Sequence, residues 1–163
     1  NYFSWTILAT MIFLFPLNIG FYKIYRKMDL KEAIVLQDFF SGYSGINFFI
    51  YISYYLFWSM IYNITMATVV FGVIWVFVTL FVVPLMFFEN KTIFESIKLN
   101  FQALKKHFLI IFVCLFAAIF IKYIGIFVFG IGILFTYPFV NAMIYALYKS
   151  LFVEDKLKET PVY

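Results

Sequence analysis

The sequence contains an uncharged stretch at residues 39–88, FFSGYSGINFFIYISYYLFWSMIYNITMATVVFGVIWVFVTLFVVPLMFF. These 50 consecutive residues include no Asp, Glu, Lys, Arg or His. A helix needs about 20 apolar residues to cross a bilayer, so the stretch has room for two crossings joined by a short turn. The favoured turn is at residues 63–65, because Trp58 and Tyr62 beside it are typical of a membrane–water interface.

The composition of the chain lies outside the range of soluble domains. Hydrophobic residues make up 66% of the sequence and charged residues 12%, whereas soluble domains have about 45–50% and about 25%. A water-soluble chain of 163 residues exposes more surface than so few charges can cover. A transmembrane barrel is disfavoured too, because barrel strands alternate polar and apolar residues. The composition therefore predicts an all-α membrane protein.

Two further apolar stretches complete the predicted topology. Residues 1–22 hold no charge, and residues 108–148 hold only Lys122. We predict a polytopic transmembrane helical bundle with five spans, at about residues 2–22, 44–62, 66–88, 107–123 and 126–148. Residues 1–152 are expected to form a single transmembrane domain, and residues 153–163 a short cytoplasmic tail. The total becomes six spans if an N-terminal helix is missing before Asn1, which is not a methionine.

Basic residues predict the orientation of the spans, since Lys and Arg accumulate in cytoplasmic loops. Eleven of the 12 basic residues lie in the segments that follow the first, third and fifth predicted spans. Only Lys122 falls on the opposite side. The basic loops and the C-terminus are therefore predicted to face the cytoplasm.

Prolines and capping patterns indicate a weak internal repeat. Pro16 and Pro84 each lie near the cytoplasmic end of a predicted span, seven residues before the next lysine. Similar cytoplasmic segments follow, LKEAI at residues 30–34 and IFESI at residues 93–97. Each segment carries a helix-capping pattern, Asp29 with Glu32 and Thr92 with Glu95. Such a repeat predicts a bundle with pseudo-symmetry about the membrane normal.

Residues 92–108 predict a short amphipathic helix at the cytoplasmic surface. Its apolar side chains recur every three or four residues and comprise Phe94, Ile97, Phe101, Leu104 and Phe108. The candidate interfacial contacts for lipids or a partner are Lys98, Lys105, Lys106 and His107. Because no Gly or Pro interrupts the chain from Thr92 to Gly125, we expect a bent or continuous long helix.

Three motifs resemble those of a known family. They read DFFSGYSG at residues 38–45, TIFESIKLNF at residues 92–101 and YPFVNAMIYALYKSLF at residues 137–152. The chain resembles the bacterial six-helix membrane proteins of the DUF975 type, which are related to the membrane domain beside some glycerophosphodiester phosphodiesterases. The resemblance covers nearly the whole chain, without the family's first helix. It implies a multi-pass protein of the bacterial inner membrane and brings no catalytic residues.

The sequence predicts no catalytic, cofactor-binding or metal-binding site. It has no Gly-rich phosphate loop, no Ser/His/Asp arrangement and no Cys/His cluster. The single histidine, His107, has no potential metal ligand at helical spacing, and the single cysteine, Cys114, lies in an apolar stretch. We therefore expect no cofactor and no nucleic-acid partner.

Asn18 and Asn141 are the candidate intramembrane polar contacts. They follow Pro16 and Pro138 by two and three residues, where their amides are placed to satisfy carbonyls freed by proline or to bond across helices. A substrate site is the alternative for the same residues. Lys122 is expected to extend from the external edge to the interface.

Two functions fit these observations. The first is a non-enzymatic integral membrane subunit or scaffold of an inner-membrane assembly, with membrane lipids and a protein partner or a second copy as its partners. The alternative is a transporter or handler of lipids or other hydrophobic small molecules, in a cavity between proline-bent helices. An enzyme is disfavoured, because the cytoplasmic acids Asp38, Glu89 and Glu95 have no nucleophile beside them in the sequence.

Overall fold

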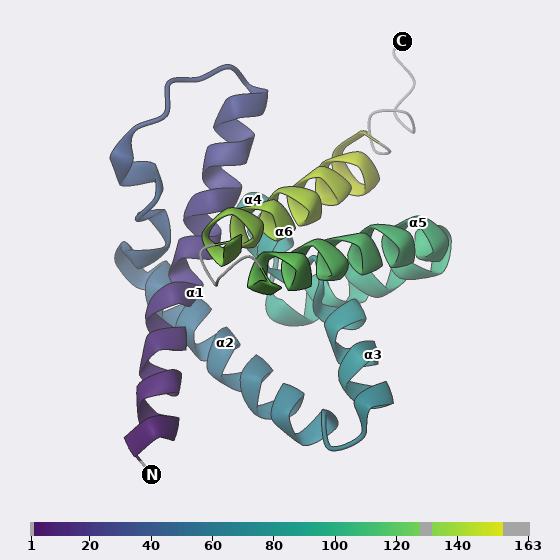
Figure 1. Cartoon of the computed structure of the whole chain (residues 1–163). Helices are drawn as coiled ribbons and strands as arrows, with labels where there is room; N and C mark the ends of the chain where they lie inside the picture. The colour runs from purple at the N-terminus through teal and green to yellow at the C-terminus, as the bar shows by residue number, and fades with distance from the viewer. Residues whose placement is uncertain (1, 128–131, 155–163) are drawn as a thin grey trace. The chain divides into compact units, whose positions relative to one another are not determined.

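The computed structural model describes residues 2–127 and 132–154, and these residues are helical with short connections and no strand (Figure 1). This agrees with the predicted all-α class. The chain divides into two compact units, Asn1–Thr79 and Leu80–Tyr163. The single transmembrane domain stays a prediction. The predicted tail at residues 153–163 lies outside the described residues apart from its first two.

The first unit contains three long helices and two short 3₁₀ turns. They are α1 (Tyr2–Asp29), η1 (Leu36–Asp38), η2 (Ser41–Tyr43), α2 (Gly45–Thr65) and α3 (Val69–Thr79). Helix α1 packs against η2 and α2, and α2 packs against α3. The indole Nε1 of Trp58 on α2 donates to Thr79 Oγ1 on α3 at 2.8 Å. The turn between α2 and α3 follows Thr65, so it lies just after the predicted position at residues 63–65.

Helix α1 ends where a second helix was expected to begin. Asp29 is its last residue, and Lys31 has a left-handed φ of 55°. The amide of Glu32 donates to Lys27 O at 2.9 Å, which closes the helix C-terminus with a Schellman bond. The predicted capped helix at residues 30–34 is therefore wrong. Residues 32–35 leave the helix, and the Val35 N–H donates to Asp38, three residues further on. The ion pairs of Asp38 with Lys23 and Lys27 on α1 are the tertiary contacts that override local helix propensity.

Two glycines allow α1 to touch the following turns backbone to backbone. A Cβ at Gly20 would lie 2.1 Å from Phe39 O, and a Cβ at Gly42 would lie 2.2 Å from Pro16 O. No side-chain carbon fits at either place, so only glycine permits this approach. The hydroxyl of Tyr43 donates to Phe13 O, one turn before Pro16. The turns thereby supply a donor to α1 close to Pro16, although the carbonyl that this proline leaves without its amide donor is that of Ile12.

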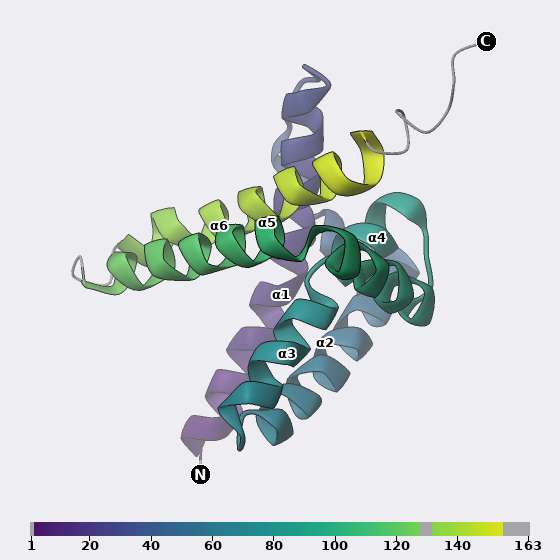
Figure 2. The ribbon, with the colours of Figure 1, turned by 90° about the vertical axis from the view of Figure 1, so that its right-hand side faces the viewer.

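The second unit is built from three helices and a terminal π-helical turn. They are α4 (Val82–Glu89), α5 (Ile93–Phe127), α6 (Gly132–Tyr148) and η3 (Lys149–Glu154). Helices α5 and α6 lie side by side (Figure 2). The core contains Phe81, whose ring meets that of Phe152 edge-on at 5.5 Å between centroids. Residues 128–131 lie outside the described residues.

The third predicted span is broken in the middle. Helix α3 ends at Thr79 and α4 begins at Val82, whereas one helix was expected over residues 66–88. Pro84 explains the break, because it offers no N–H to the carbonyl of Leu80 and clashes with that carbonyl in a continuous helix. The break exposes the amide of Phe81, which donates instead to Asn100 Oδ1 at 3.0 Å.

Within the part of the chain that the structure describes, two stretches are long and apolar enough to cross a membrane, Val69–Glu89 and Ile93–Ile121. In the 18-residue apolar window of the second stretch, 22% of the residues are buried within the chain. The core helix of a soluble protein is mostly buried, so this helix is unlike one. The other spans of the predicted five-span topology stay a prediction.

The glycine contacts predict unequal effects of two alanine substitutions. Gly20→Ala should lower the free energy of unfolding by about 1–3 kcal/mol, because its Cβ meets rigid backbone and α1 must move away. Chemical denaturation of the detergent-purified protein measures this change.

Gly72→Ala is the matched control, since its Cβ would meet the flexible side-chain end of Met66. Alanine also favours a helix over glycine by about 1 kcal/mol. The expected change is therefore small or stabilising. Equal losses for the two variants would contradict the proposed backbone contact between α1 and the turn.

Candidate functional site

The four predicted interfacial residues lie together in α5, at and just before a bend. Lys98, Lys105 and Lys106 are exposed, and His107 is half-buried. His107 has non-helical φ and ψ of −129° and 31°, which divide α5 into two helical parts. The expectation of a bent long helix is confirmed. The bend falls at the cytoplasmic boundary that the sequence predicted for the fourth span.

The helix start at α5 follows the predicted capping pattern. Glu95 Oε2 accepts from the amide of Thr92 and from its hydroxyl, at 2.9 Å each. The amide of Glu95 donates back to Thr92 Oγ1 at 3.4 Å. This reciprocal pairing is a capping box. It fixes where α5 begins and thus which side chains its first half presents outward.

The apolar row predicted on this helix is divided between two faces. Phe94 is 84% exposed, Phe101 47% and Phe108 56%, whereas Leu104 is buried. The fold instead buries Ser96, Asn100 and Ala103. The prediction that all five apolar residues share one face was therefore wrong. The inward face instead contains small and polar residues, which leave room for the backbone at Phe81 to pack against the helix. The phenylalanines point away from the unit.

Lysines stand between these exposed aromatic residues. Lys98 lies between Phe94 and Phe101, and Lys105 lies between Phe101 and Phe108, at spacings of three and four residues. The Nζ atom of Lys105 lies 4.7 Å from the centroid of the Phe101 ring. This is the geometry of a cation–π contact. We call Phe94, Lys98, Phe101 and Lys105 the basic aromatic surface.

Beyond His107 the exposed face of α5 is apolar. Leu109 is 75% exposed, Val113 57%, Phe116 65% and Phe120 63%. The rings of Phe108, Phe112 and Phe116 follow one another at centroid distances of 5.8 and 6.2 Å. Ile111, Leu115 and Ala118 face inward and are buried. Large apolar side chains on the outside of a helix are typical of a lipid-facing or partner-facing surface.

Asn100 is a structural residue that the sequence analysis did not single out. Its side chain is completely buried, and its Oδ1 accepts the amide of Phe81 at the break between α3 and α4. The spacing of Ser96 and Asn100, one helical turn apart on a face with Ala103, was the available signal. Small and polar residues at such spacing place a helix close to a neighbouring backbone.

The candidate polar contacts Asn18 and Asn141 lie in different units. Asn18 is half-buried in α1, and Asn141 is buried in α6. The amide Nδ2 of Asn141 donates to Tyr137 O at 3.5 Å, one turn earlier in the same helix. The carbonyl that Pro138 deprives of its donor is four residues before it, at Leu134. Asn141 thus donates to the carbonyl of Tyr137, and the predicted contacts with a freed carbonyl or across helices stay a prediction.

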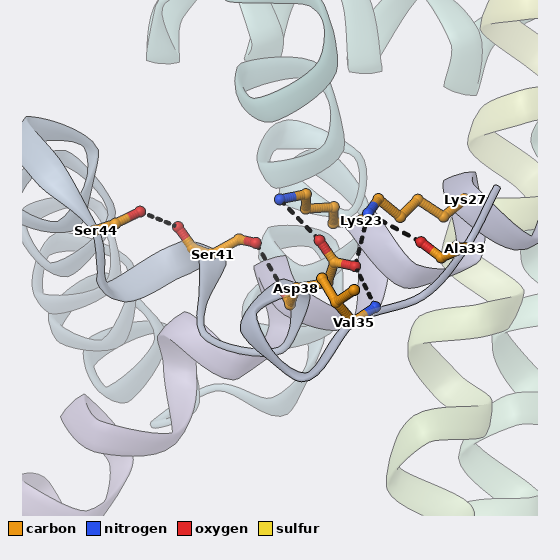
Figure 3. A network of polar contacts seen from close by, with 7 residues as sticks. All are labelled: Lys23, Lys27, Ala33, Val35, Asp38, Ser41 and Ser44. Atoms are coloured by element: carbon orange, nitrogen blue, oxygen red, sulfur yellow. Dashed lines mark hydrogen bonds and ion pairs between the residues drawn. The ribbon is translucent and has the colours of Figure 1, made fainter.

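A buried ion-pair cluster joins α1 to the loop that follows it (Figure 3). Asp38 is 2% exposed, and its two carboxylate oxygens lie 3.0 Å from Lys23 Nζ and 2.8 Å from Lys27 Nζ. The Val35 amide donates to the carboxylate at 3.0 Å. Lys27 also donates to Ala33 O at 3.2 Å. The two lysines lie one turn apart on α1, so a single carboxylate bridges both.

These partners make Asp38 a structural anion and a poor base. The bonds from Lys27 and the Val35 amide, with Lys23 beside them, hold the pKa of Asp38 well below its usual range. A general base at neutral pH needs a pKa near the working pH. The cluster was missed because the sequence places the lysines and Asp38 in separate segments. Their pairing depends on the chain reversing direction after Asp29.

Among the described residues, no three His, Cys, Asp or Glu side chains are placed to hold a metal ion. Cys114 lies half-buried within α5. Comparison with known proteins finds no matching family model, no matching curated protein and no matching solved structure. The resemblance to the DUF975 type therefore stays a prediction.

The Asp38 cluster predicts a pH dependence of stability. Because its pKa is lowered on folding, the carboxylate contributes its full stabilisation above its unfolded pKa of about 3.9, and this contribution is lost progressively as the pH falls from there through the lower folded pKa. Asp38→Asn should lower the melting temperature at pH 7 by several degrees. It should also reduce the loss of melting temperature between about pH 5 and pH 3.

The matched control is Glu32→Gln, which changes an exposed acid in the same loop. Its melting profile should retain the steep acid limb of the parent chain. An Asp38→Asn profile with the same acid limb as the parent would show that the carboxylate does not titrate with folding.

Proposed function

We propose that this chain is a multi-pass, non-enzymatic subunit or scaffold of a bacterial inner-membrane assembly. The observation that carries the proposal is the outward apolar face of α5, where Leu109, Phe116 and Phe120 are each more than 60% exposed. Exposing such an apolar face to water is unfavourable in free energy, whereas contact with lipid or a hydrophobic partner is favourable.

The buried polar side chains support a structural role. Asp38 is held by two lysines, Asn100 accepts the Phe81 amide, and Thr79 Oγ1 accepts from Trp58 and donates to Trp75 O at 2.7 Å. Each of these groups is used within the fold. In a transporter, buried polar and ionisable groups face a substrate path instead.

The charge pattern supports the proposed orientation. The last turn of α1 carries Arg26 and Lys27, and the first half of α5 carries Lys98, Lys105 and Lys106. The predicted topology puts both regions on the cytoplasmic side, in agreement with the preference of basic residues for that side. A handler of hydrophobic small molecules, the alternative function, has the same topology and differs in what it retains on purification.

The topology is tested by single cysteines in a Cys114→Ser chain. Lys31→Cys and Gln102→Cys lie at exposed positions on the predicted cytoplasmic side, and Ala67→Cys lies in the exposed turn between α2 and α3. A membrane-impermeant maleimide should label Ala67→Cys in intact spheroplasts and the other two only after lysis. Labelling of all three in intact spheroplasts, or extraction of the chain by alkaline carbonate, would contradict the multi-pass proposal.

The scaffold role is tested by purification from the native membrane in mild detergent. We expect a stoichiometric protein partner or a homo-oligomer, identified by mass spectrometry and native mass. Substitution of the outward apolar face by Phe116→Ala and Phe120→Ala tests whether that face contributes to the contact. A monomer that retains a hydrophobic small molecule and no protein would favour the alternative function.

A further inference from the structure

The first half of α5 presents charge and aromatic rings on one outward face. Phe94, Lys98, Phe101 and Lys105 follow one another at spacings of four, three and four residues, which place them on one side of a helix. All four are exposed, and the opposite face is buried at Ser96 and Asn100. The fold therefore holds this surface outward at a fixed rotation of the helix.

The local charge of the basic aromatic surface is positive. Lys98 and Lys105 lie on it, and Lys106 is exposed beside it. The nearest acid in the sequence is Glu95, whose Oε2 already accepts two bonds from Thr92. The ammonium of Lys105 lies over the Phe101 ring, so a positive charge and an apolar face are presented together. This combination matches a lipid surface, where phosphate oxygens lie above acyl chains.

The composition of the exposed face of α5 changes at His107. Exposed aromatic residues continue along α5 through Phe108, Phe112 and Phe116, but no lysine follows Lys106 until Lys122. One side of the bend thus presents rings with cations and the other presents rings alone. A bilayer changes in the same order, from charged headgroups at its surface to hydrocarbon in its interior.

We propose that the basic aromatic surface binds the headgroups of anionic phospholipids, with Lys98 and Lys105 at the phosphate and Phe94 and Phe101 in the upper acyl region. The inference rests on the proposed membrane location and adds a preference for anionic over zwitterionic lipid. A juxtamembrane lysine contributes about 1 kcal/mol of attraction to an anionic surface, which corresponds to roughly fivefold in association.

The test places a fluorophore beside the surface and measures quenching by spin-labelled lipids. The full chain carries Cys114→Ser and a labelled Gln102→Cys, an exposed position between the two lysines. It is reconstituted in nanodiscs with headgroup-matched spin-labelled phosphatidylglycerol or phosphatidylcholine. We expect stronger quenching by phosphatidylglycerol, and a roughly tenfold or greater loss of this preference in Lys98→Gln/Lys105→Gln.

Controls separate charge from folding and from the membrane proposal. Lys98→Arg/Lys105→Arg keeps the charges and should keep the preference, and Lys31→Gln removes an exposed lysine elsewhere and should leave it unchanged. Equal quenching by the two lipids in the parent chain would overturn the inference. So would cross-linking of position 102 to a protein partner in native membranes. If carbonate extracts the chain, the membrane proposal fails first, whereas equal quenching of a carbonate-resistant chain overturns this inference alone.

Discussion

Pairing of backbone amides and carbonyls in apolar surroundings is the constraint on which this structure depends. Only 12% of the residues are charged, and Pro16 and Pro84 interrupt the backbone hydrogen bonds of their helices. An unpaired buried backbone group costs several kcal/mol in hydrocarbon. Asn100 supplies the partner of the Phe81 amide at the break before Pro84, and Tyr43 donates to the Phe13 carbonyl close to Pro16. The break before Pro84 therefore fixes which neighbouring segment packs beside it.

The same constraint explains the close contact of α1 with the loop after it. Glycine at positions 20 and 42 brings backbone onto backbone. The single negative charge of Asp38 bridges Lys23 and Lys27 and offsets part of their repulsion, since they lie one turn apart on α1. The loop is short of large apolar side chains facing inward, so an ion pair and steric fit hold it. The sheltered charges lie at the end of α1 rather than within its apolar part.

Sequence reasoning predicted what depends on composition and local pattern. The all-α class, the capping box at Thr92 and the bend before the apolar part of α5 follow from residues close together in the chain, and the structure confirms them in the described residues. A proline bend was expected in this span, but the break at residues 80–81 that divides it into two helices was not, because apolar residues continue on both sides. The Asp38 cluster was missed because it requires the chain reversal after α1.

The position of the bend in α5 has a consequence for length. The helix has 35 residues, and at 1.5 Å per residue a straight helix would extend about 52 Å, far beyond the hydrocarbon thickness of about 30 Å. The part after His107 runs to Phe127, which corresponds to about 30 Å. In the proposed membrane location, the bend divides α5 so that one part matches the thickness of the bilayer and the other follows its surface. A displaced bend would leave the apolar part too long or too short, and the mismatch would be met by tilt.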